Sequence, residues 1–444
     1  YTFDVPVRTG GPQTWALRAN DRAVFRRPLT SLNAAAHMHF DGAPGSVVAF
    51  DKASPGFEAH MAFTNTCVQV GAPTAPFGVD GLKVEFIATD NAATSSTRPF
   101  LHVTNSCDVT SPIWFGGNAQ MYALTIDANT TNTLKKVSYK YMTKNNWSAY
   151  TYAGPNSYTV FAEGTDAGSV VTYFCGTKEQ GEKPVFEFLK SENNGAHVYF
   201  NDIHMIARAG GWSGYAFILN NTYFDAYADT VFALTDHVAH ETIINEGSTF
   251  NIHGTTQKVC RGRGAGTIVG EEGSCVLYWT TNDVKTCETV YAGAVSFEML
   301  KGKINLTGKS PSTGKFSVTN GVATLSASAS WTNAPSVTVS GKGTLNVSSS
   351  GNFGPAATWH VGGDGIVNLA SGVRAKAAAL YLNDSETPAP DGVYGSAEYS
   401  FLVELGHWKG DEWTVMAARI GGLFFLFGII WTLVVIVEVI YNFK

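Results

Sequence analysis

Residues 337–347 read VTVSGKGTLNV, and residues 359–369 read WHVGGDGIVNL. Aligned at an offset of 22 residues, the two segments carry valine, glycine, asparagine and aliphatic residues at matching positions. The matched pairs are Val339 with Val361, Gly341 with Gly363, Gly343 with Gly365, Leu345 with Val367, Asn346 with Asn368, and Val347 with Leu369. Related apolar positions 21 or 22 residues away extend the pattern in both directions, through Val318, Leu325 and Leu382. A unit of 21–22 residues therefore recurs about four times between residues 303 and 395.

Each unit is predicted to form two short strands joined by a turn and followed by a longer loop. Apolar residues alternate within the strands, so one face of each strand is expected to be buried. A single unit cannot bury that face alone, whereas stacked units can. The pattern therefore predicts a β-solenoid in which strands of successive coils pair in parallel.

The repeated polar positions have a structural explanation. Stacked coils would place Asn346 above Asn368, with each amide hydrogen-bonded to its neighbour, and we prefer this ladder to a ligand-binding role. The glycines at the other repeated positions suit turns that need positive φ. They do not indicate a phosphate-binding loop, because no helix follows them. These repeated glycines are Gly341, Gly343, Gly363 and Gly365.

Two runs in this region resemble a known family. The run INLTGKSPSTGKFSVTNGVATLSASASWTNAPSVTVSGKGTLNV (304–347) is similar to the autotransporter-associated β-strand repeat of bacterial surface proteins. The run AALYLNDSETPAPDGVYGSAEY (378–399) is similar to the closing segment of such arrays. The resemblance covers roughly residues 300–400. It implies a right-handed parallel β-helix on an exported bacterial protein, and it carries no catalytic residues. No translocator barrel follows the repeats in this sequence, which favours a membrane-anchored version.

The composition agrees with an all-β ectodomain. Charged residues are 15% and hydrophobic residues 44%, which argues against both a disordered chain and a long-helix protein. The net charge is −6 and no strongly basic patch occurs, so nucleic acid is excluded as an expected partner. We expect residues 301–405 to form the repeats and residues 1–300 an irregular, cysteine-containing β region. That region either continues the solenoid, which we favour, or forms a β-sandwich cap.

The C-terminal residues predict a membrane anchor. Residues 420–441 contain one charged residue, Glu438, and as a helix they would be about 33 Å long, enough to cross a bilayer. Residues 406–419 would be a juxtamembrane linker, and Arg419, Trp431 and Glu438 are the candidate anchor residues. The order of the elements predicts a single-pass protein of the cell envelope whose N-terminal ectodomain lies outside the cytoplasm. Glu438 either reaches the interface or pairs with a basic group of a partner subunit.

The six cysteines are expected to form disulfides. An even count without a CxxC pair suits an oxidising compartment better than a zinc site. Six cysteines allow fifteen connectivities, and the sequence does not choose among them. The disulfide candidates are Cys67, Cys107, Cys175, Cys260, Cys275 and Cys287.

Candidate catalytic and metal-binding residues are sparse. The densest polar cluster runs from Asp225 to Glu241 and includes Asp229, Asp236, His237 and His240. The sequence HVAHE matches neither of the two metalloprotease motifs, HExxH and HxxEH. Zinc would need a third ligand besides the two histidines; His253 is present in the sequence, but nothing singles it out for that role. The glycines between Cys260 and Cys275 do not fit GxGxxG. We therefore predict no catalytic residue, cofactor or metal.

Three functions remain open on the sequence. The first is a structural or adhesive surface protein whose partners are the bilayer and surface glycans. The second is a subunit of a larger membrane assembly held by the C-terminal helix. The third is an anchored enzyme acting on polysaccharide, with Asp225, Asp229, Asp236 and His237 as first suspects. We favour the first.

Overall fold

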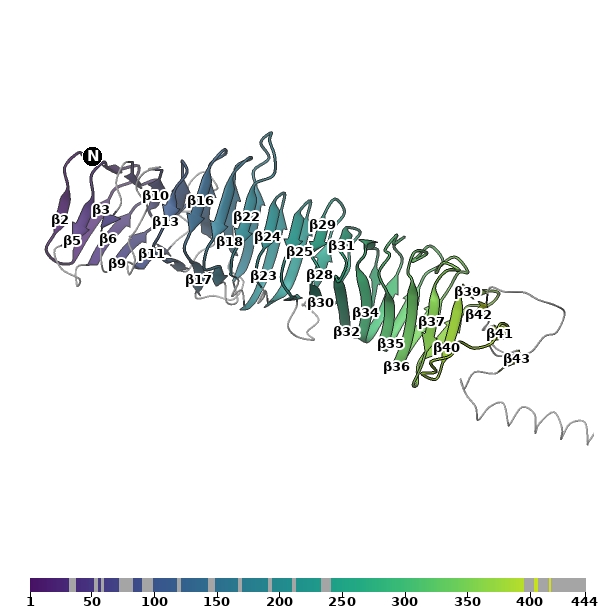
Figure 1. Cartoon of the computed structure of the whole chain (residues 1–444). Coiled ribbons are helices and arrows are strands. Elements are labelled where there is room, and N and C mark those ends of the chain that lie inside the picture. The colour runs from purple at the N-terminus through teal and green to yellow at the C-terminus, as the bar shows by residue number, and fades with distance from the viewer. Residues whose placement is uncertain are drawn as a thin grey trace, which may run out of the picture.

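The structure is a computed structural model of the whole chain. It describes residues 1–31, 37–51, 55–56, 60–71, 83–89, 99–117, 121–142, 148–166, 170–190, 194–209, 213–232, 241–394, 403–405 and 415–416. Within these ranges the chain is all-β and forms a parallel β-solenoid of about 14 turns. Figure 1 shows the coils stacked into one elongated body, with the N-terminal strands at one end.

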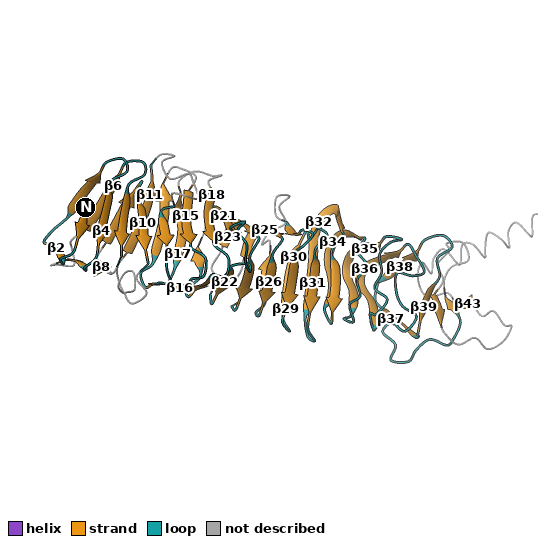
Figure 2. Cartoon of the chain, turned by 90° about the horizontal axis from the view of Figure 1, so that it is seen from above, coloured by secondary structure: helices purple, strands orange, loops and turns teal. Residues whose placement is uncertain are grey.

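The coils build three principal sheets among the described residues, and Figure 2 shows them from a second direction. The long sheet has 20 strands. They are β1 (Thr2–Phe3), β4 (Arg22–Phe25), β7 (Val47–Phe50), β10 (Cys67–Val70), β12 (Leu101–Val103), β15 (Met121–Ile126), β18 (Ser148–Ala153), β21 (Val171–Gly176), β23 (Asn194–Asn201), β25 (Ser213–Asn220), β27 (Thr230–Phe232), β28 (Thr242–Ile244), β30 (Thr256–Cys260), β32 (Cys275–Cys287), β34 (Ser296–Leu306), β35 (Phe316–Leu325), β36 (Ser336–Val347), β37 (Thr358–Val361), β38 (Ile366–Leu369) and β40 (Ala379–Leu382).

The other two principal sheets have seven and nine strands. The seven-stranded sheet contains β3 (Gln13–Leu17), β6 (His37–Gly42), β9 (His60–Thr64), β11 (Lys83–Ala88), β14 (Ile113–Gly117), β17 (Val137–Met142) and β20 (Thr165–Asp166). The nine-stranded sheet contains β13 (Asp108–Val109), β16 (Thr131–Leu134), β19 (Tyr158–Phe161), β22 (Val185–Phe188), β24 (His204–Ala207), β26 (Tyr223–Ala226), β29 (Thr249–Ile252), β31 (Thr267–Gly270) and β33 (Val290–Gly293).

Two small sheets complete the described strands. One contains β2 (Val7–Thr9), β5 (Leu29–Ser31) and β8 (Pro55–Gly56). The other contains β39 (Ala375–Ala377), β41 (Val393–Tyr394), β42 (Val403–Leu405) and β43 (Val415–Met416). The β41–β42 pair is antiparallel, whereas the pairs within the three principal sheets are parallel.

The strand register follows the offset of the sequence repeat. Val339 lies opposite Val361 in the β36–β37 pair, and Asn346 lies opposite Asn368 in the β36–β38 pair. The preceding coil aligns in the same way, with Leu325 opposite Val347. One repeat unit is therefore one coil, and the predicted parallel solenoid is confirmed.

The N-terminal region continues the same solenoid. Parallel pairing runs from β1 through β30 in the long sheet, so these residues do not form the alternative β-sandwich cap. Residue 300 lies inside β34, which pairs with β32 on one side and β35 on the other.

The core of the N-terminal coils is a stack of aromatic rings. On the seven-stranded sheet, Phe40, Phe63 and Phe86 stack with centroid separations of 5.1 and 5.5 Å. Phe115 and Tyr139 extend the stack at 5.1 and 5.6 Å. Because each ring fills the same position in its own coil, burial of about 150–250 Å² per ring repeats along the axis.

The prediction of disulfides is wrong for this structure, in which no two of the six cysteines form a disulfide. The physical reason is register: Cys260 and Cys275 lie on paired strands but opposite Trp279 and Thr256, and Cys275 and Cys287 lie at opposite ends of β32. Burial raises the pKa of the Cys67 thiol to about 12, against a smaller opposing effect of Arg22. Burial also raises the pKa of the Cys175, Cys275 and Cys287 thiols, so these three and Cys67 stay protonated at neutral pH.

The predicted C-terminal anchor lies outside the described residues. Arg419, Trp431, Glu438 and the whole of residues 420–441 are in that part of the chain. Among the residues that are described, no helix is long and apolar enough to span a bilayer.

Candidate functional site

Asp225 lies at the centre of the densest polar cluster in the described chain, on the nine-stranded sheet. Its carboxylate contacts Nε2 of His204 at 2.5 Å and Nε2 of His253 at 3.0 Å, and it accepts a hydrogen bond from Asn251 at 2.9 Å. His253 also contacts Glu271 through Nδ1 at 2.8 Å. These side chains come from β24, β26 and β29 and from the turns that follow the strands.

Tyr227 connects His253 to Arg208 and Glu187, which lie on the preceding coils. Its ring stacks on the His253 imidazole with centroids 4.0 Å apart and planes 2° apart. The Arg208 guanidinium lies 4.2 Å from the centroid of the same ring and forms an ion pair with Glu187 at 2.7 Å. We name Glu187, His204, Arg208, Asp225, Tyr227, His253 and Glu271 the carboxylate–histidine cluster.

Two carboxylates of the cluster, Asp225 and Glu187, are held in their ionised form. Burial acts to raise the pKa of Asp225, but hydrogen bonds from His204, His253 and Asn251 outweigh it and bring that pKa to about 2. Burial also opposes ionisation of Glu187, and its hydrogen bonds with Tyr158 and Arg208 lower the pKa overall. For His253, burial favours the neutral ring, but the hydrogen bonds to Asp225 and Glu271 raise the pKa overall.

This arrangement suits a structural role, in which the cluster links neighbouring coils, better than acid–base catalysis. Glu187 and Asp225 flank Ile206 in the sheet register, so their backbones are about 9.6 Å apart. Carboxyl groups at a comparable distance serve inverting glycosidases, but that chemistry needs one of the two to be a proton donor. Both carboxyl pKa values are instead lowered.

The other sequence suspects divide between structural contacts and undescribed residues. Asp229 accepts a hydrogen bond from the backbone N–H of Thr256 at 2.7 Å, which joins adjacent coils. Glu241 lies with Arg263 at 2.6 Å and Lys285 at 3.1 Å, away from the cluster's own contacts. Asp236, His237 and His240 lie outside the described residues. Within the described part, no group of three or more possible ligands is arranged to hold a metal ion.

The repeated asparagines and glycines lie where the repeat predicts. Asn368 donates to Asn346 at 2.9 Å, and Asn346 donates to the Thr324 hydroxyl at 2.9 Å. Gly341 and Gly363 adopt φ values of 57° and 58°. The expectation of positive φ is wrong for Gly343 and Gly365, which are needed for space instead: a Cβ on them would lie 2.1 or 2.5 Å from a carbonyl oxygen of the preceding coil. Gly341 meets both restrictions, because its Cβ would also lie 2.5 Å from the carbonyl oxygen of Thr319.

A row of outward-facing tyrosines on the long sheet was not singled out from the sequence. Four rings stack across four adjacent strands, with successive centroids 5.2, 4.5 and 4.6 Å apart. We name this row the tyrosine ladder; its members are Tyr122 (β15), Tyr150 (β18), Tyr173 (β21) and Tyr199 (β23). Tyr152 lies beside it, 5.6 Å from the Tyr122 ring.

The strands position the ladder by simple alternation. In β18 the residues are alternately partly exposed and buried, so Tyr150 and Tyr152 face outward while Ala149 and Thr151 face the core. The alternating tyrosines of SAYTYA (148–153) are the signal that sequence reasoning could have used. The spacing between ladder members varies from 23 to 28 residues, which hides the period.

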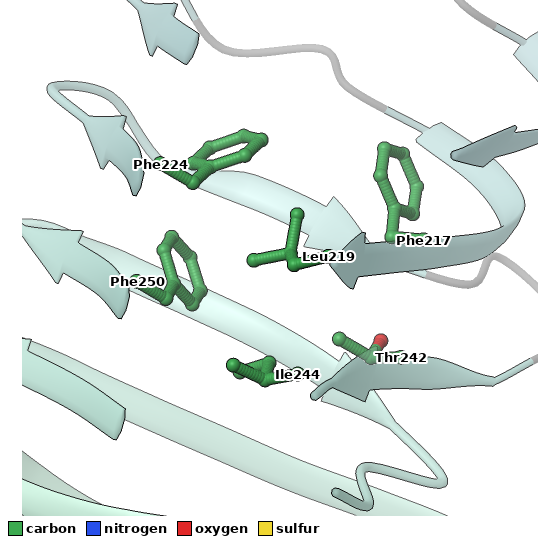
Figure 3. A pocket seen from close by; sticks show the side chains of 6 residues that line it. All are labelled: Phe217, Leu219, Phe224, Thr242, Ile244 and Phe250. Carbon is green, nitrogen blue, oxygen red and sulfur yellow. The ribbon is translucent and has the colours of Figure 1, made fainter. Parts of the chain in front are cut away.

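One small cavity lies in the hydrophobic core. Its walls are apolar apart from the methyl-bearing Thr242, and it has room for no more than about one water molecule. Figure 3 shows the rings and aliphatic side chains that line it, namely Phe217, Leu219, Phe224, Thr242, Ile244 and Phe250. The gap offers no polar group to orient a substrate, so the exposed sheet faces are the better candidate sites.

Comparison with known proteins adds no assignment. No family model matches the chain, and no curated protein or solved structure matches it either.

Proposed function

We propose that this chain is an exported, membrane-anchored bacterial surface protein whose right-handed β-solenoid is a structural or adhesive ectodomain. The observation that carries the proposal is the tyrosine ladder, an ordered row of partly exposed aromatic side chains on a flat face of an elongated scaffold. Contact surfaces of binding proteins are enriched in tyrosine, because its ring gives contact area and its hydroxyl gives a hydrogen bond.

The anchoring part of the proposal rests on residues 420–441. Their length and near absence of charge suit a single span, and Trp431 and the other apolar residues suit the bilayer interior and its borders. An anchored rod would hold its side faces away from the membrane, where a surface ligand can reach them.

Reconstitution of the full chain tests both parts. The full chain should float with liposomes in a density gradient, and a chain ending at Arg419 should remain at the bottom. Fluorescent proteoliposomes carrying the full chain should be retained on immobilised polysaccharides or on cell-surface proteins, whereas protein-free liposomes should not. A full chain that neither floats nor confers retention would contradict the proposal.

Two other functions predict different results. A subunit of an assembly would be extracted from its native membrane with stoichiometric partners, and Glu438→Gln would release them. A polysaccharide-degrading enzyme would release reducing sugar and lose that activity in Asp225→Asn. The lowered carboxyl pKa values in the cluster favour neither proton donation nor this enzyme.

A further inference from the structure

We propose that the tyrosine ladder binds an uncharged polysaccharide, with the sugar chain extended along the solenoid axis. This inference rests on the proposed adhesive function and gives it a site and a class of ligand. It is carried by three properties of the ladder: the orientation of its rings, the arrangement of its hydroxyls, and the lack of charge on its four strands.

The orientation of the rings favours a long ligand over a single sugar. Tyr150 is stacked between Tyr122 and Tyr173, and the planes of these pairs differ by 19° and 8°. Tyr173 is stacked in turn on Tyr199 with planes 14° apart. Because neighbouring rings cover the faces of the inner two, those rings offer edges and hydroxyls to a ligand. A ligand therefore gains more contact by lying along the row than by stacking on one ring.

Hydroxyls of the ladder hydrogen-bond to one another and to Tyr152 beside it. Hydrogen bonds join Tyr150 to Tyr173 and Tyr122 to Tyr152. Burial, followed by the neighbouring tyrosines, raises the pKa of Tyr173 to about 12, so its hydroxyl keeps its proton. A phenol can donate one and accept two hydrogen bonds, so a hydroxyl bonded along the row can still bond outward to a sugar hydroxyl.

The distance between successive tyrosine rings of the ladder is close to the length of one sugar unit in a polysaccharide. Successive rings follow the strand spacing of about 4.8 Å, which is close to the length of one pyranose ring. An extended polysaccharide can therefore present one sugar per coil, so that each coil repeats the same weak contact. Repeated contacts of this kind add through a high effective concentration, so affinity should increase with chain length.

The four described strands that carry the ladder have no formal charge from Asp, Glu, Lys or Arg. The strands β15, β18, β21 and β23 contain none of these four residue types. Two carboxylates directly follow strands of the ladder, and each is bonded at the strand end: Asp127 follows β15 and contacts His102 at 2.8 Å, and Asp202 follows β23 and accepts a hydrogen bond from Asn221 at 2.7 Å. Along the four strands themselves an anionic polymer would find no cation and a cationic polymer no carboxylate, so these strands match an uncharged ligand.

Other polar rows on the described surface bond mainly within themselves. The carboxylate–histidine cluster links its own coils, as shown above. Beside the ladder, Asn220 donates to Asn201 at 2.6 Å and Asn245 donates to Asn220 at 2.5 Å. Such rows hold neighbouring coils together, and the ladder adds partly exposed ring edges that a ligand can contact.

Affinity electrophoresis of the full chain in mild detergent tests the site. The gels would contain dextran, mannan, a soluble β-glucan or, as an anionic comparison, alginate. The informative variant is Y122F/Y150F/Y173F/Y199F, which keeps the ring stack and removes the hydroxyls. Y381F is the matched control, because Tyr381 also stacks on the long sheet, 4.6 Å from His360 and many coils away.

We expect at least one uncharged polysaccharide to retard the wild-type chain and Y381F equally. The quadruple variant should show the same thermal unfolding but at least a tenfold weaker affinity, and short oligosaccharides should bind more weakly than the polymer. Unchanged affinity in the quadruple variant, or binding to alginate alone, would overturn the inference.

The remaining outcomes separate this inference from the proposed function. Proteoliposomes that adhere to cell-surface proteins but to no polysaccharide would retain the adhesive function and overturn the ladder's ligand. Association of the wild-type chain into dimers that the quadruple variant abolishes would assign the ladder to a second copy of this chain and overturn the inference. Proteoliposomes that adhere to neither polysaccharides nor cell-surface proteins would contradict both the adhesive function and the ladder's ligand.

Discussion

At the scale of single residues, ionisable side chains stabilise this solenoid by linking neighbouring coils through residues that are far apart in sequence. Asp225 and His253 are 28 residues apart and contact each other at 3.0 Å. The side chain of Asp225 is only 13% exposed, so solvent screens its contacts less than those of a surface pair. These contacts should make the stability of the central coils depend on pH.

The sign of that dependence follows from the two pKa shifts. The raised pKa of His253 gives stability that is complete below about pH 6.5, the unfolded value, and is lost as pH rises through the folded value. The lowered pKa of Asp225 gives stability that is complete above its unfolded value of 3.8 and is lost as pH falls through about 2. The cluster should therefore stabilise most between about pH 4 and pH 6.5.

His253→Asn tests this window. The substitution should lower the free energy of unfolding by about 1.5–3 kcal/mol at pH 5, the value of a hydrogen bond to a charged group, and by less at pH 8.5. Urea unfolding followed by circular dichroism at both pH values provides the measurement. Asp225→Asn combined with His253→Asn should shrink the difference between the two pH values, and an equal loss at both would contradict the account.

Asn346 offers a second residue-scale prediction. Asn346→Ala removes its hydrogen bonds to Thr324 and Asn368, so the free energy of unfolding should fall by about 1–2 kcal/mol. Thr344→Ala, two residues away on the same outward face of β36, is the control and should cost less. Equal losses in the two variants would show that the asparagine ladder contributes nothing particular.

At the scale of strands and turns, two kinds of glycine shape each coil. Gly363 provides a positive φ of 58°, and the nearest atom to an added Cβ would be 3.3 Å away. Gly343 instead lies against the preceding coil, where a Cβ would be 2.1 Å from the carbonyl oxygen of Val318. The first position is restricted by conformation and the second by space.

Alanine at the two positions should therefore have unequal effects. Gly363→Ala should cost about 1 kcal/mol, the usual strain of a non-glycine residue with positive φ. Gly343→Ala must push two backbones apart, so the cost should exceed about 3 kcal/mol and the yield of soluble protein should fall. Thermal unfolding of the full chain in detergent measures both, and equal midpoints for the two variants would be evidence against the close approach.

At the scale of the whole molecule, regular coils could be predicted from the sequence and irregular ones could not. Between Val318 and Leu382 the coil length stays at 21–22 residues, so aligned residues identify register partners directly. In the N-terminal coils, loops of different length separate the strands, and tyrosines that stack in space are 28, 23 and 26 residues apart. The ladder and the cluster around Asp225 therefore depend on register that only the structure provides.

The wrong prediction about the cysteines has the same origin. The prediction of disulfides used the even number of cysteines and the expected oxidising compartment. Neither says where each coil places its thiol. The structure instead separates Cys260 and Cys275 across the β30–β32 pair, where their register partners are Trp279 and Thr256. The fold is held by parallel strand pairing and a stacked aromatic core, and it uses no disulfide among these six cysteines.

The account depends most on the alignment of four tyrosines from separate coils into one outward row. Cross-linking of Tyr150→Cys with Tyr173→Cys tests that alignment, because the two residues are register partners in the β18–β21 pair. Their Cα atoms should lie about 5 Å apart with both side chains outward, a geometry that permits a disulfide. We expect rapid oxidation of this pair, detected by mass spectrometry of the linked peptides, and little for Tyr150→Cys with Thr172→Cys. Preferential linkage through position 172 would mean a register shifted by one residue, with the ladder broken and its binding face lost.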